Sequence, residues 1–492
     1  MSVLPLPRAG WRNLGILAVA GAVAALGQAP FDFWHVGILG FAVGIGGVSL
    51  AARPGRAAWA FGVGYFAIAL HWIVEPFLVD AARHGWMAPF GLAAMAGGLA
   101  LFWAAAGFCA AFAKGATFRA FLFATALALA EVARAYILSG FPWAHPGHIL
   151  IDTPALGLAP FAGPHGLTMT VLALGATLAT LMARPIWAAS VFGVVFLVLQ
   201  LSPQPAPDAA SDTAARVRLV QPNAAQHLKW REDMIPVFFE RGLELSRGAD
   251  VDLIVWPETT LPVLLERSTP WRAAIAEAAG GVPVAVGAQR LDNGQARNSM
   301  ALLDGEGEIG PIYDKHRLVP FGEYIPLRSV ADLLRLDGLA AIAGGGYWPG
   351  AGPAVADFGP RLGRAFLMIC YEAIFPQYIR QVERPDWQLH LTNDAWFGTF
   401  SGPFQHLALA RLRAAESGLP VLRAANTGVS AAIDGRGQVV ASLALGTAGA
   451  LDVALPPALP RTLYARTGDL PVFVLLVAVL VTLLTVARKM RH

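Results

Sequence analysis

Three side chains with complementary chemistry lie beside apolar runs or turn residues. Glu258 comes two residues after the apolar run 253–256, and Cys370 comes directly after 365–369. Lys315 lies in a Tyr-Asp-Lys-His segment that is rich in turn residues. Because α/β enzymes build their sites at strand ends, a carboxylate base, a cation and a thiol nucleophile there would suffice for acyl transfer. A lone buried cysteine is more often a small core residue, so only the neighbouring motifs favour catalysis.

Other patterns point to less specific chemistry. Gly305, Gly307 and Gly310 have the spacing of a dinucleotide-binding fingerprint, but the turn residues and proline around them favour a hairpin turn. His145 and His148 are spaced like metal ligands, but no third ligand lies near them in the sequence. The sequence contains no G-x-S-x-G elbow and no Walker A loop. We therefore expect no metal and no cofactor, and neither a serine hydrolase nor an ATPase.

The composition indicates a membrane protein. Of the 492 residues, 56% are apolar and only 14% are charged, against about 25% charged in an ordinary soluble domain. The mean hydropathy is +0.53. The pI of about 9.0 corresponds to a net charge of only +3 from dispersed residues, which makes a nucleic-acid partner a poor interpretation. Two cysteines exclude a disulfide scaffold.

Charged residues are rare in the first part of the chain. Residues 1–200 contain 14 of the 69 charged residues. A bilayer core of about 30 Å takes roughly 20 apolar residues as a helix, and the apolar runs here lack the alternation of barrel strands. Candidate spans lie near 13–31, 34–52, 57–75, 87–113, 119–138, 165–183, 185–201 and 469–487. The pattern predicts a membrane α-helical bundle of about eight transmembrane helices.

The basic residues predict the orientation of these helices. If the N-terminus is cytoplasmic, Arg83 is the one basic residue in the short outward loops, and the long outward loop 140–164 has none. The cytoplasmic segments would contain Arg8, Arg12, Arg53, Arg56, Lys114, Arg119, Arg184, Arg488, Lys489 and Arg491. The positive-inside rule therefore predicts that residues 202–468 lie outside the cytoplasm.

The domain organisation follows from these patterns. We expect a seven-helix transmembrane domain at 1–201, a proline-rich linker at 202–215, a catalytic domain at 216–455, and a C-terminal transmembrane helix with a basic tail at 456–492. Apolar runs typical of strands lie at 217–220, 253–256, 282–287, 300–303, 365–369 and 388–392, with a helix at 404–417 and two strands within 421–443. This mixture predicts a layered α/β sandwich.

Two opposite charges lie within the fifth candidate span. Glu131 and Arg134 are three residues apart, so they can pair on one face of a helix. Charges inside a membrane are costly and often functional. We favour a structural pair that anchors the outer loop 140–164 over a catalytic role.

Several motifs together resemble a known family. They are Trp-Pro-Glu at 256–258, Lys-His-Arg-Leu-Val-Pro-Phe-Gly-Glu-Tyr at 315–324, Cys-Tyr-Glu at 370–372, Asn-Asp-Ala-Trp-Phe-Gly at 393–398 and Gly-Phe-Pro-Trp at 140–143. They resemble the apolipoprotein N-acyltransferases of the nitrilase, or carbon–nitrogen hydrolase, superfamily. The resemblance covers essentially the whole chain. It implies a nitrilase-like α-β-β-α sandwich beside the helices, in the inner membrane of a bacterium with the catalytic domain on the periplasmic side.

The resemblance also implies a reaction and its residues. The acyl donor would be a phospholipid, and the acceptor would be the N-terminal amine of a diacylated apolipoprotein. Cys370 would carry the acyl chain as a thioester, Glu258 would be the general base, and Lys315 would stabilise the oxyanion. Glu323 and Glu372 would support the site by positioning the lysine and shaping the pocket. Neither a metal nor a cofactor is implied.

Three aromatic residues near these motifs allow two interpretations. Trp230, Tyr371 and Trp396 would line a pocket for lipid or lipopeptide, or they would be plain core. Two other functions also stay open. One is a membrane-tethered nitrilase-type amidase that acts on a small amide, which does not explain seven preceding spans. The other is a non-catalytic lipid-binding protein, against which the intact triad argues.

Overall fold

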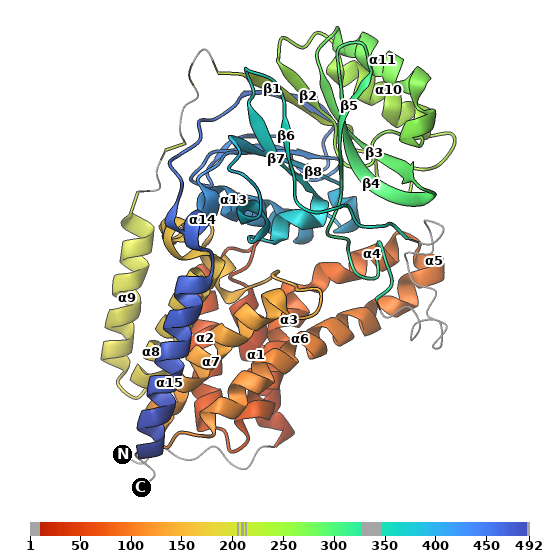
Figure 1. The fold of residues 1–492 in the computed structure, drawn as a ribbon. Coiled ribbons are helices and arrows are strands. Elements are labelled where there is room, and N and C mark those ends of the chain that lie inside the picture. The colour runs from red at the N-terminus through yellow and green to blue at the C-terminus, as the bar shows by residue number, and fades with distance from the viewer. Residues whose placement is uncertain (1–9, 204–205, 208–210, 212–213, 327–345, 490–492) are drawn as a thin grey trace. The chain divides into compact units, whose positions relative to one another are not determined.

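The computed structural model describes residues 10–203, 206–207, 211, 214–326 and 346–489, and contacts divide the chain into two compact units (Figure 1). We call residues 1–205, 400–408 and 462–492 the helical unit, and residues 206–399 and 409–461 the sandwich unit. Half of the linker predicted at 202–215 lies outside the described residues.

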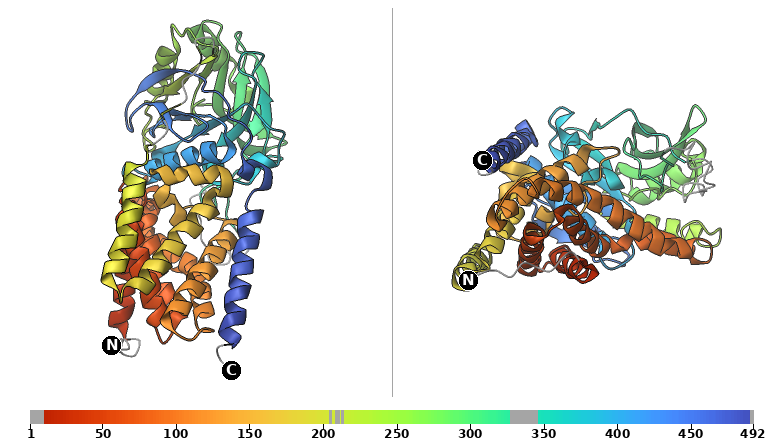
Figure 2. Two further views of the ribbon diagram at one scale, coloured as in Figure 1. Left: turned by 90° about the vertical axis from the view of Figure 1, so that its left-hand side faces the viewer. Right: turned by 90° about the horizontal axis from the view of Figure 1, so that it is seen from below.

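The long helices of the helical unit are apolar and run side by side (Figure 2), and short helices lie between them in the chain. Together they are α1 (Trp11–Ala25), α2 (Trp34–Leu50), α3 (Pro54–Ala69), α4 (Glu75–Leu78), α5 (Ala81–His84), α6 (Ala88–Ala110), α7 (Ala116–Tyr136), α8 (Ala159–Leu181), α9 (Pro185–Leu201), α14 (Leu463–Thr467) and α15 (Leu470–Lys489). Helices α1 and α3 approach so closely that a Cβ atom at Gly64 would lie 1.8 Å from the carbonyl oxygen of Ala18. Small residues permit this backbone contact, as is common between membrane helices.

The structure supports fewer membrane spans than the sequence pattern predicts. By length and composition, four helices of the described residues can cross a membrane, namely Ala81–Ala110, Ala116–Tyr136, Pro154–Leu181 and Leu470–Lys489. The bent pair Pro54–Ala69 and His71–Leu78 would be a fifth. Helices α1, α2 and α9 contain only 15, 17 and 17 residues, against the roughly 20 that a bilayer core needs. Four or five spans are thus supported, and the total of about eight stays a prediction.

The sandwich unit contains two six-stranded sheets, which confirms the predicted α/β sandwich. The strand orders are β12-β1-β2-β3-β4-β5 and β11-β10-β9-β8-β7-β6. The strands of the first sheet are β1 (Arg216–Gln221), β2 (Leu253–Val255), β3 (Val284–Asp292), β4 (Gln295–Leu303), β5 (Ile309–Asp314) and β12 (Gly449–Ala454). Those of the second are β6 (Val355–Asp357), β7 (Arg364–Ile369), β8 (Trp387–Thr392), β9 (Val421–Ala425), β10 (Ala431–Ile433) and β11 (Val439–Ser442).

Parallel strands form the centre of each sheet. β1, β2 and β3 are parallel neighbours, and so are β7, β8 and β9. Strands that are buried on both faces have continuous apolar sequences, which explains why apolar runs predicted these strands. The glycines at 305–310 lie in and after the turn between β4 and β5, so the hairpin interpretation is confirmed.

The interpretation of residues 421–443 as two strands was wrong. This region contains β9, β10 and β11, because the chain already reverses between Ala425 and Ala431. The turn within 434–437 joins β10 to β11. The earlier reversal contains the turn residues Asn426, Thr427 and Gly428, a signal that the two-strand interpretation did not use. The predicted helix is α13 (Gly402–Ser417), whose residues up to 408 group with the helical unit.

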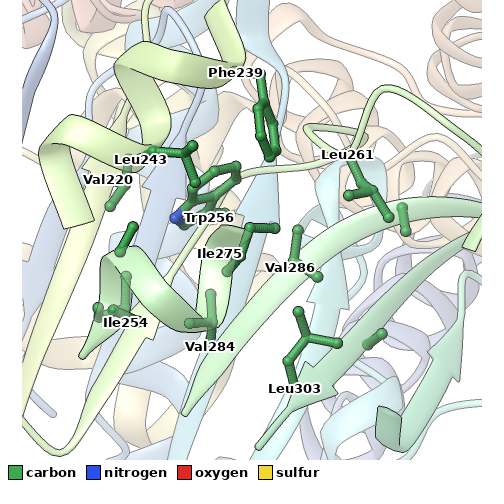
Figure 3. Packing of buried hydrophobic residues seen from close by; sticks show 14 of the residues in the cluster. Val220, Phe239, Leu243, Ile254, Trp256, Leu261, Ile275, Val284, Val286 and Leu303 are labelled. Atoms are coloured by element: carbon green, nitrogen blue, oxygen red, sulfur yellow. The ribbon is translucent and has the colours of Figure 1, made fainter. Parts of the chain in front are cut away.

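A hydrophobic core lies between the first sheet and the helices α10 (Ile235–Ser246) and α11 (Thr269–Ala279) (Figure 3). Trp256 is completely buried in it, and its indole Nε1 donates a hydrogen bond to Ser246 Oγ over 2.9 Å. Phe239 from α10 and Ile275 from α11 belong to the same cluster. Because Trp256 is two residues before Glu258, this core fixes the start of the turn that carries the predicted base.

Candidate active site

The structure brings the three predicted catalytic residues together in the sandwich unit. Glu258 follows β2, Lys315 follows β5 and Cys370 follows β7, and all three are buried. The Lys315 Nζ atom lies 3.3 Å from Glu258 Oε1. The Cys370 thiol is close enough to both charges for each to shift its pKa. The ends of three strands thus place a carboxylate, an ammonium and a thiol close together, and the catalytic roles of these residues stay a prediction.

Besides Lys315, groups from two other segments hold the Glu258 carboxylate. Asn298 Nδ2 donates to its Oε1 atom over 2.7 Å, and the Asn393 backbone N–H donates to its Oε2 atom over 2.8 Å. The turn that carries Glu258 packs against strand β3 at Gly287. A Cβ atom on Gly287 would lie 2.4 Å from the Pro257 carbonyl oxygen. Glycine is required there because any side chain would displace the turn that carries Glu258.

Lys315 lies between two carboxylates. Its Nζ atom donates to Glu323 Oε1 over 2.8 Å as well as contacting Glu258. Burial by itself would lower the pKa of the Lys315 ammonium, but the charges of Glu323 and Glu258 outweigh it and hold this pKa well above its ordinary value. Glu323 is itself fixed, because its Oε2 atom accepts from the Val319 backbone N–H over 2.8 Å. Lys315 is therefore a permanent, oriented cation.

Cys370 occupies a sharp elbow at the end of β7. Its φ angle is +51°, in the left-handed region that side chains other than glycine rarely adopt, and the short 3-10 helix Cys370–Ile374 begins there. Burial, and next the charge of Glu258, raises the pKa of the Cys370 thiol, whereas Lys315 acts in the opposite direction. The thiol is therefore protonated at rest and needs a base when it attacks.

Glu372 joins the segment that carries the lysine to the segment that carries the cysteine. Its Oε1 atom accepts from the His316 backbone N–H over 2.8 Å, and its Oε2 atom accepts from the Ile369 backbone N–H over 2.8 Å. These two N–H groups belong to the residues that adjoin Lys315 and Cys370 in the chain. One carboxylate thus holds both segments.

Comparison with known proteins agrees with this geometry. Residues 216–463 match the carbon–nitrogen hydrolase family, and residues 20–177 match the apolipoprotein N-acyltransferase N-terminal domain. The chain is 37% identical over 523 residues to an apolipoprotein N-acyltransferase of Rhodopseudomonas palustris, covering 98% of this chain and 96% of that protein. A relative with the same name from Caulobacter vibrioides is 36% identical and covers 93% of this chain and 92% of that protein.

The chain belongs to the apolipoprotein N-acyltransferase family. The expected enzyme class, acyltransferase, is thereby confirmed, and the match of the helical region disfavours the alternative of a tethered amidase. Among solved structures, an amidase from Nesterenkonia sp. superimposes on 54% of this chain and 97% of its own, with a TM-score of 0.37 and 18% identity.

The three aromatic residues that we expected around an acyltransferase pocket differ in their surroundings. Trp230 is 42% exposed, and its ring centroid lies 5.4 Å from the Lys229 ammonium. Tyr371 is buried and packs edge-on against Phe375. Trp396 is half-buried in a short 3-10 helix. The structure thus leaves Trp230 accessible and places Tyr371 in the core, and a shared lipid pocket stays a prediction.

Sequence reasoning missed two polar residues of this acyltransferase site. Asn298 also donates to Glu323 Oε1 over 3.2 Å, so one amide contacts both carboxylates. Lys229 donates to the Glu258 carbonyl oxygen over 3.2 Å, and burial lowers the pKa of Lys229 to about 8 although the charge of Glu258 opposes it. No clear signal marked Asn298, because the first half of β4 also contains Gln295, Arg297 and Ser299.

In the helical unit, the predicted Glu131–Arg134 pair exists. Both residues are buried, and Arg134 Nη2 lies 2.5 Å from Glu131 Oε2. Arg134 Nη1 also donates to the Trp143 carbonyl oxygen over 2.9 Å, and His145 Nδ1 lies 2.7 Å from Glu131 Oε2. The pair therefore anchors the loop that follows α7, as expected.

His145 contacts this pair, and His148 packs edge-on against the His145 ring. Among the residues that the structure describes, no cluster of metal-binding side chains is found.

Proposed function

We propose that this acyltransferase moves an acyl chain from a phospholipid, through a Cys370 thioester, to the N-terminal amine of a diacylated apolipoprotein. Family membership supports the N-acylation of lipoproteins. The observation that carries the residue assignment is the Lys315 ammonium, held between Glu258 and Glu323 beside the buried thiol. This arrangement combines a base, an oxyanion-stabilising cation and a nucleophile.

In the first half-reaction, Glu258 removes the thiol proton as the Cys370 sulfur attacks the ester carbonyl of the phospholipid. The Lys315 ammonium stabilises the negative charge that develops on the carbonyl oxygen. The ester C–O bond then breaks, and the departing alkoxide takes the proton from Glu258. The products are a thioester on Cys370 and a lysophospholipid.

In the second half-reaction, the amine of the apolipoprotein attacks the thioester. Glu258 takes a proton from the amine, Lys315 again stabilises the tetrahedral oxyanion, and the C–S bond breaks. The leaving sulfur of Cys370 receives the proton from Glu258, so the thiol and the base are both restored. The product is an amide, and because the energy of the ester drives both steps, neither ATP nor a metal takes part in this scheme.

The supporting residues and the aromatic residues receive corresponding roles in this proposal. Glu323 keeps Lys315 charged, and Glu372 keeps the segments of Lys315 and Cys370 in register. Trp230 supplies an accessible aromatic surface for lipid. Tyr371 and Trp396 shape the wall of the pocket.

The proposal is tested by the mass of the Cys370 peptide after the purified protein has been incubated with phospholipid alone. We expect an added acyl chain that hydroxylamine removes and that disappears when a diacylated peptide is added. The Cys109 peptide of the same sample is the internal control, because Cys109 is the other thiol of the chain. An acyl chain on a different residue, or release of free fatty acid without transfer to the peptide, would contradict the proposal.

We also propose that about eight helices span the inner membrane of a bacterium and that the sandwich unit faces the periplasm. The support is the distribution of basic residues. In a Cys109→Ala parent, a membrane-impermeant thiol label applied to intact spheroplasts should reach cysteines introduced at Ser211 and Thr447. It should not reach cysteines introduced at Arg56 and Lys114. Labelling of the Arg56 site from outside would reverse the orientation.

A further inference from the structure

A buried histidine contacts the backbone of the proposed nucleophile, Cys370. His390 is in the middle of β8, completely shielded from solvent, and its Nε2 atom lies 3.1 Å from the Cys370 carbonyl oxygen. Its Nδ1 atom lies 2.9 Å from Arg423 Nη1 on the neighbouring strand β9, where the two residues are direct register partners. None of the sequence motifs considered above contains His390 or Arg423.

The neighbours of His390 determine its protonation state. A guanidinium only donates hydrogen bonds, so the Nδ1 atom that faces Arg423 accepts one and carries no hydrogen. A carbonyl oxygen only accepts, so the Nε2 atom that faces Cys370 carries the hydrogen and donates it. We therefore assign the neutral Nε2–H tautomer to His390 from these two contacts.

Arg423 is held in turn by a buried network. Its Nη2 group forms an ion pair with Asp394, in which both side chains are completely buried, and its Nε atom donates to the Val429 carbonyl oxygen over 3.2 Å. Asp394 also accepts a hydrogen bond from Thr392 Oγ1 over 2.9 Å. A buried ion pair is costly to desolvate and is weak evidence for stability by itself. Here its geometry has a consequence, because it orients the ring of His390.

The contact matters because of the backbone at Cys370. A left-handed conformation at a residue with a side chain is strained and persists only when its surroundings hold it, and the φ angle of Cys370 is +51°. Glu372 holds the backbone on the N-terminal side of the elbow through Ile369. His390 holds the carbonyl group of the nucleophile itself.

We propose that His390 is a positioning residue that uses its Nε2–H group to hold the Cys370 carbonyl and thereby aims the thiol at the acyl carbonyl. Arg423 and Asp394 fix its tautomer and orientation. This proposal rests on the proposed function, because it assigns His390 to the formation of the acyl-enzyme. It contacts neither the substrate nor the reacting sulfur.

Two substitutions at one position separate the two hydrogen bonds of His390. In His390→Gln, the amide nitrogen can occupy the place of Nε2 and still reach the Cys370 carbonyl. In His390→Asn, the amide oxygen can still accept from Arg423, but the side chain is too short to reach Cys370. Both variants are uncharged and differ by one methylene group, so they form a matched pair. They are made in the full-length protein with Cys109→Ala, purified in detergent.

The measurement is the rate of acyl-enzyme formation on Cys370 at varied phospholipid concentration, with thermal unfolding of each variant measured alongside. A misplacement of about 1 Å at a reacting group can cost roughly 10²-fold in rate. We expect His390→Asn to lower the maximal acylation rate by about that factor, with the KM for phospholipid unchanged. His390→Gln should recover most of the rate, and both variants should unfold at similar temperatures.

Two results would overturn the proposal. One is acylation of His390→Asn at the rate of the parent protein. The other is an equal loss of rate in both variants together with an equal loss of thermal stability, which indicates a purely structural role. Failure of the proposed function is distinguishable from both, because in that case the Cys109→Ala parent itself would form no acyl-enzyme.

Discussion

The helical unit and the sandwich unit each contain a buried cluster of carboxylates and cations, and the two clusters are built differently. In the helical unit, Glu131 and Arg134 lie one helical turn apart on α7, and the guanidinium also donates to loop carbonyl groups. In the sandwich unit, Glu258 comes from one segment and Lys315 and Glu323 come from another, and two carboxylates share one ammonium beside a thiol.

The difference indicates which cluster stabilises and which one reacts. Arg134 donates hydrogen bonds to Glu131 and to backbone carbonyl groups, so it holds the loop after α7 in place. The charge of Lys315 acts on the Cys370 thiol, and two carboxylates raise the pKa of Lys315. The sandwich cluster differs in having a thiol nucleophile beside the cation and the carboxylates, which is the combination that acyl transfer needs. The following predictions test this contrast, from the largest expected effect to the smallest.

Cys370→Ser is expected to abolish transfer altogether. A serine hydroxyl is far less ionised near neutral pH than a thiol, whose ordinary pKa is about 8.5. The measurement is the hydroxylamine-labile acyl adduct on the Cys370 peptide, which should be absent. Cys109→Ala is the control and should acylate normally, because Cys109 lies in α6 and not among the residues of the site. An adduct that persists in Cys370→Ser would identify another nucleophile.

Glu258→Gln should slow both half-reactions. The amide keeps the shape of the carboxylate but cannot take a proton, and loss of a general base typically costs about 10²–10⁴ in rate. Acyl-enzyme formation is measured before the apolipoprotein is added, and transfer is measured afterwards. Normal rates in both steps would show that Glu258 is not the base, and Glu323 or Glu372 would be the next carboxylate to test.

Lys315→Met should lower the rate by roughly 10²–10³, the cost of removing one oxyanion-stabilising donor. The matched control is Lys229→Met, because Lys229 is also a buried lysine but donates to the backbone and hydroxyl oxygens of Glu258 and Thr259. Its effect on the maximal rate should be smaller than that of Lys315→Met. Equal effects of the two substitutions would argue against a special role for Lys315 in the transition state.

Glu131→Gln should affect stability and leave the chemistry nearly unchanged. Removing one partner of a buried ion pair typically costs about 3–5 kcal/mol of stability, and here it leaves Arg134 buried without its carboxylate. Thermal unfolding in detergent should therefore occur at a lower temperature, whereas the rate per folded molecule should stay close to that of the parent. A large fall in this rate at unchanged stability would place Glu131 in the reaction.

The pH dependence of thiol alkylation should show the smallest effect. Because burial and Glu258 raise the pKa of Cys370, its reaction with iodoacetamide should increase only at a pH above the ordinary value of about 8.5. Glu258→Gln removes a charge that raises this pKa, so the midpoint should move to lower pH. Lys315→Met removes a charge that lowers it, so the midpoint should move to higher pH. Opposite shifts would contradict the electrostatic arrangement described here.

The sequence by itself determined those features that local patterns encode. The apolar runs before Glu258 and Cys370 predicted buried strands, because strands buried on both faces are continuously apolar. The spacing of Glu131 and Arg134 predicted their pair, because residues three apart share a helix face. The order of the motifs along the chain was specific enough to indicate the family before any geometry was known.

The tertiary structure alone decided which distant groups meet. Asn298 reaches the base from 40 residues away, and His390 reaches the Cys370 carbonyl from a separate strand. The structure also showed that β9 reverses into β10, and that several apolar helices are shorter than their apolar runs suggested. The physical reason is the same in each case. A buried polar group requires a hydrogen-bonding partner. Which residue becomes that partner depends on how strands and helices pack together. No local stretch of the sequence specifies this packing.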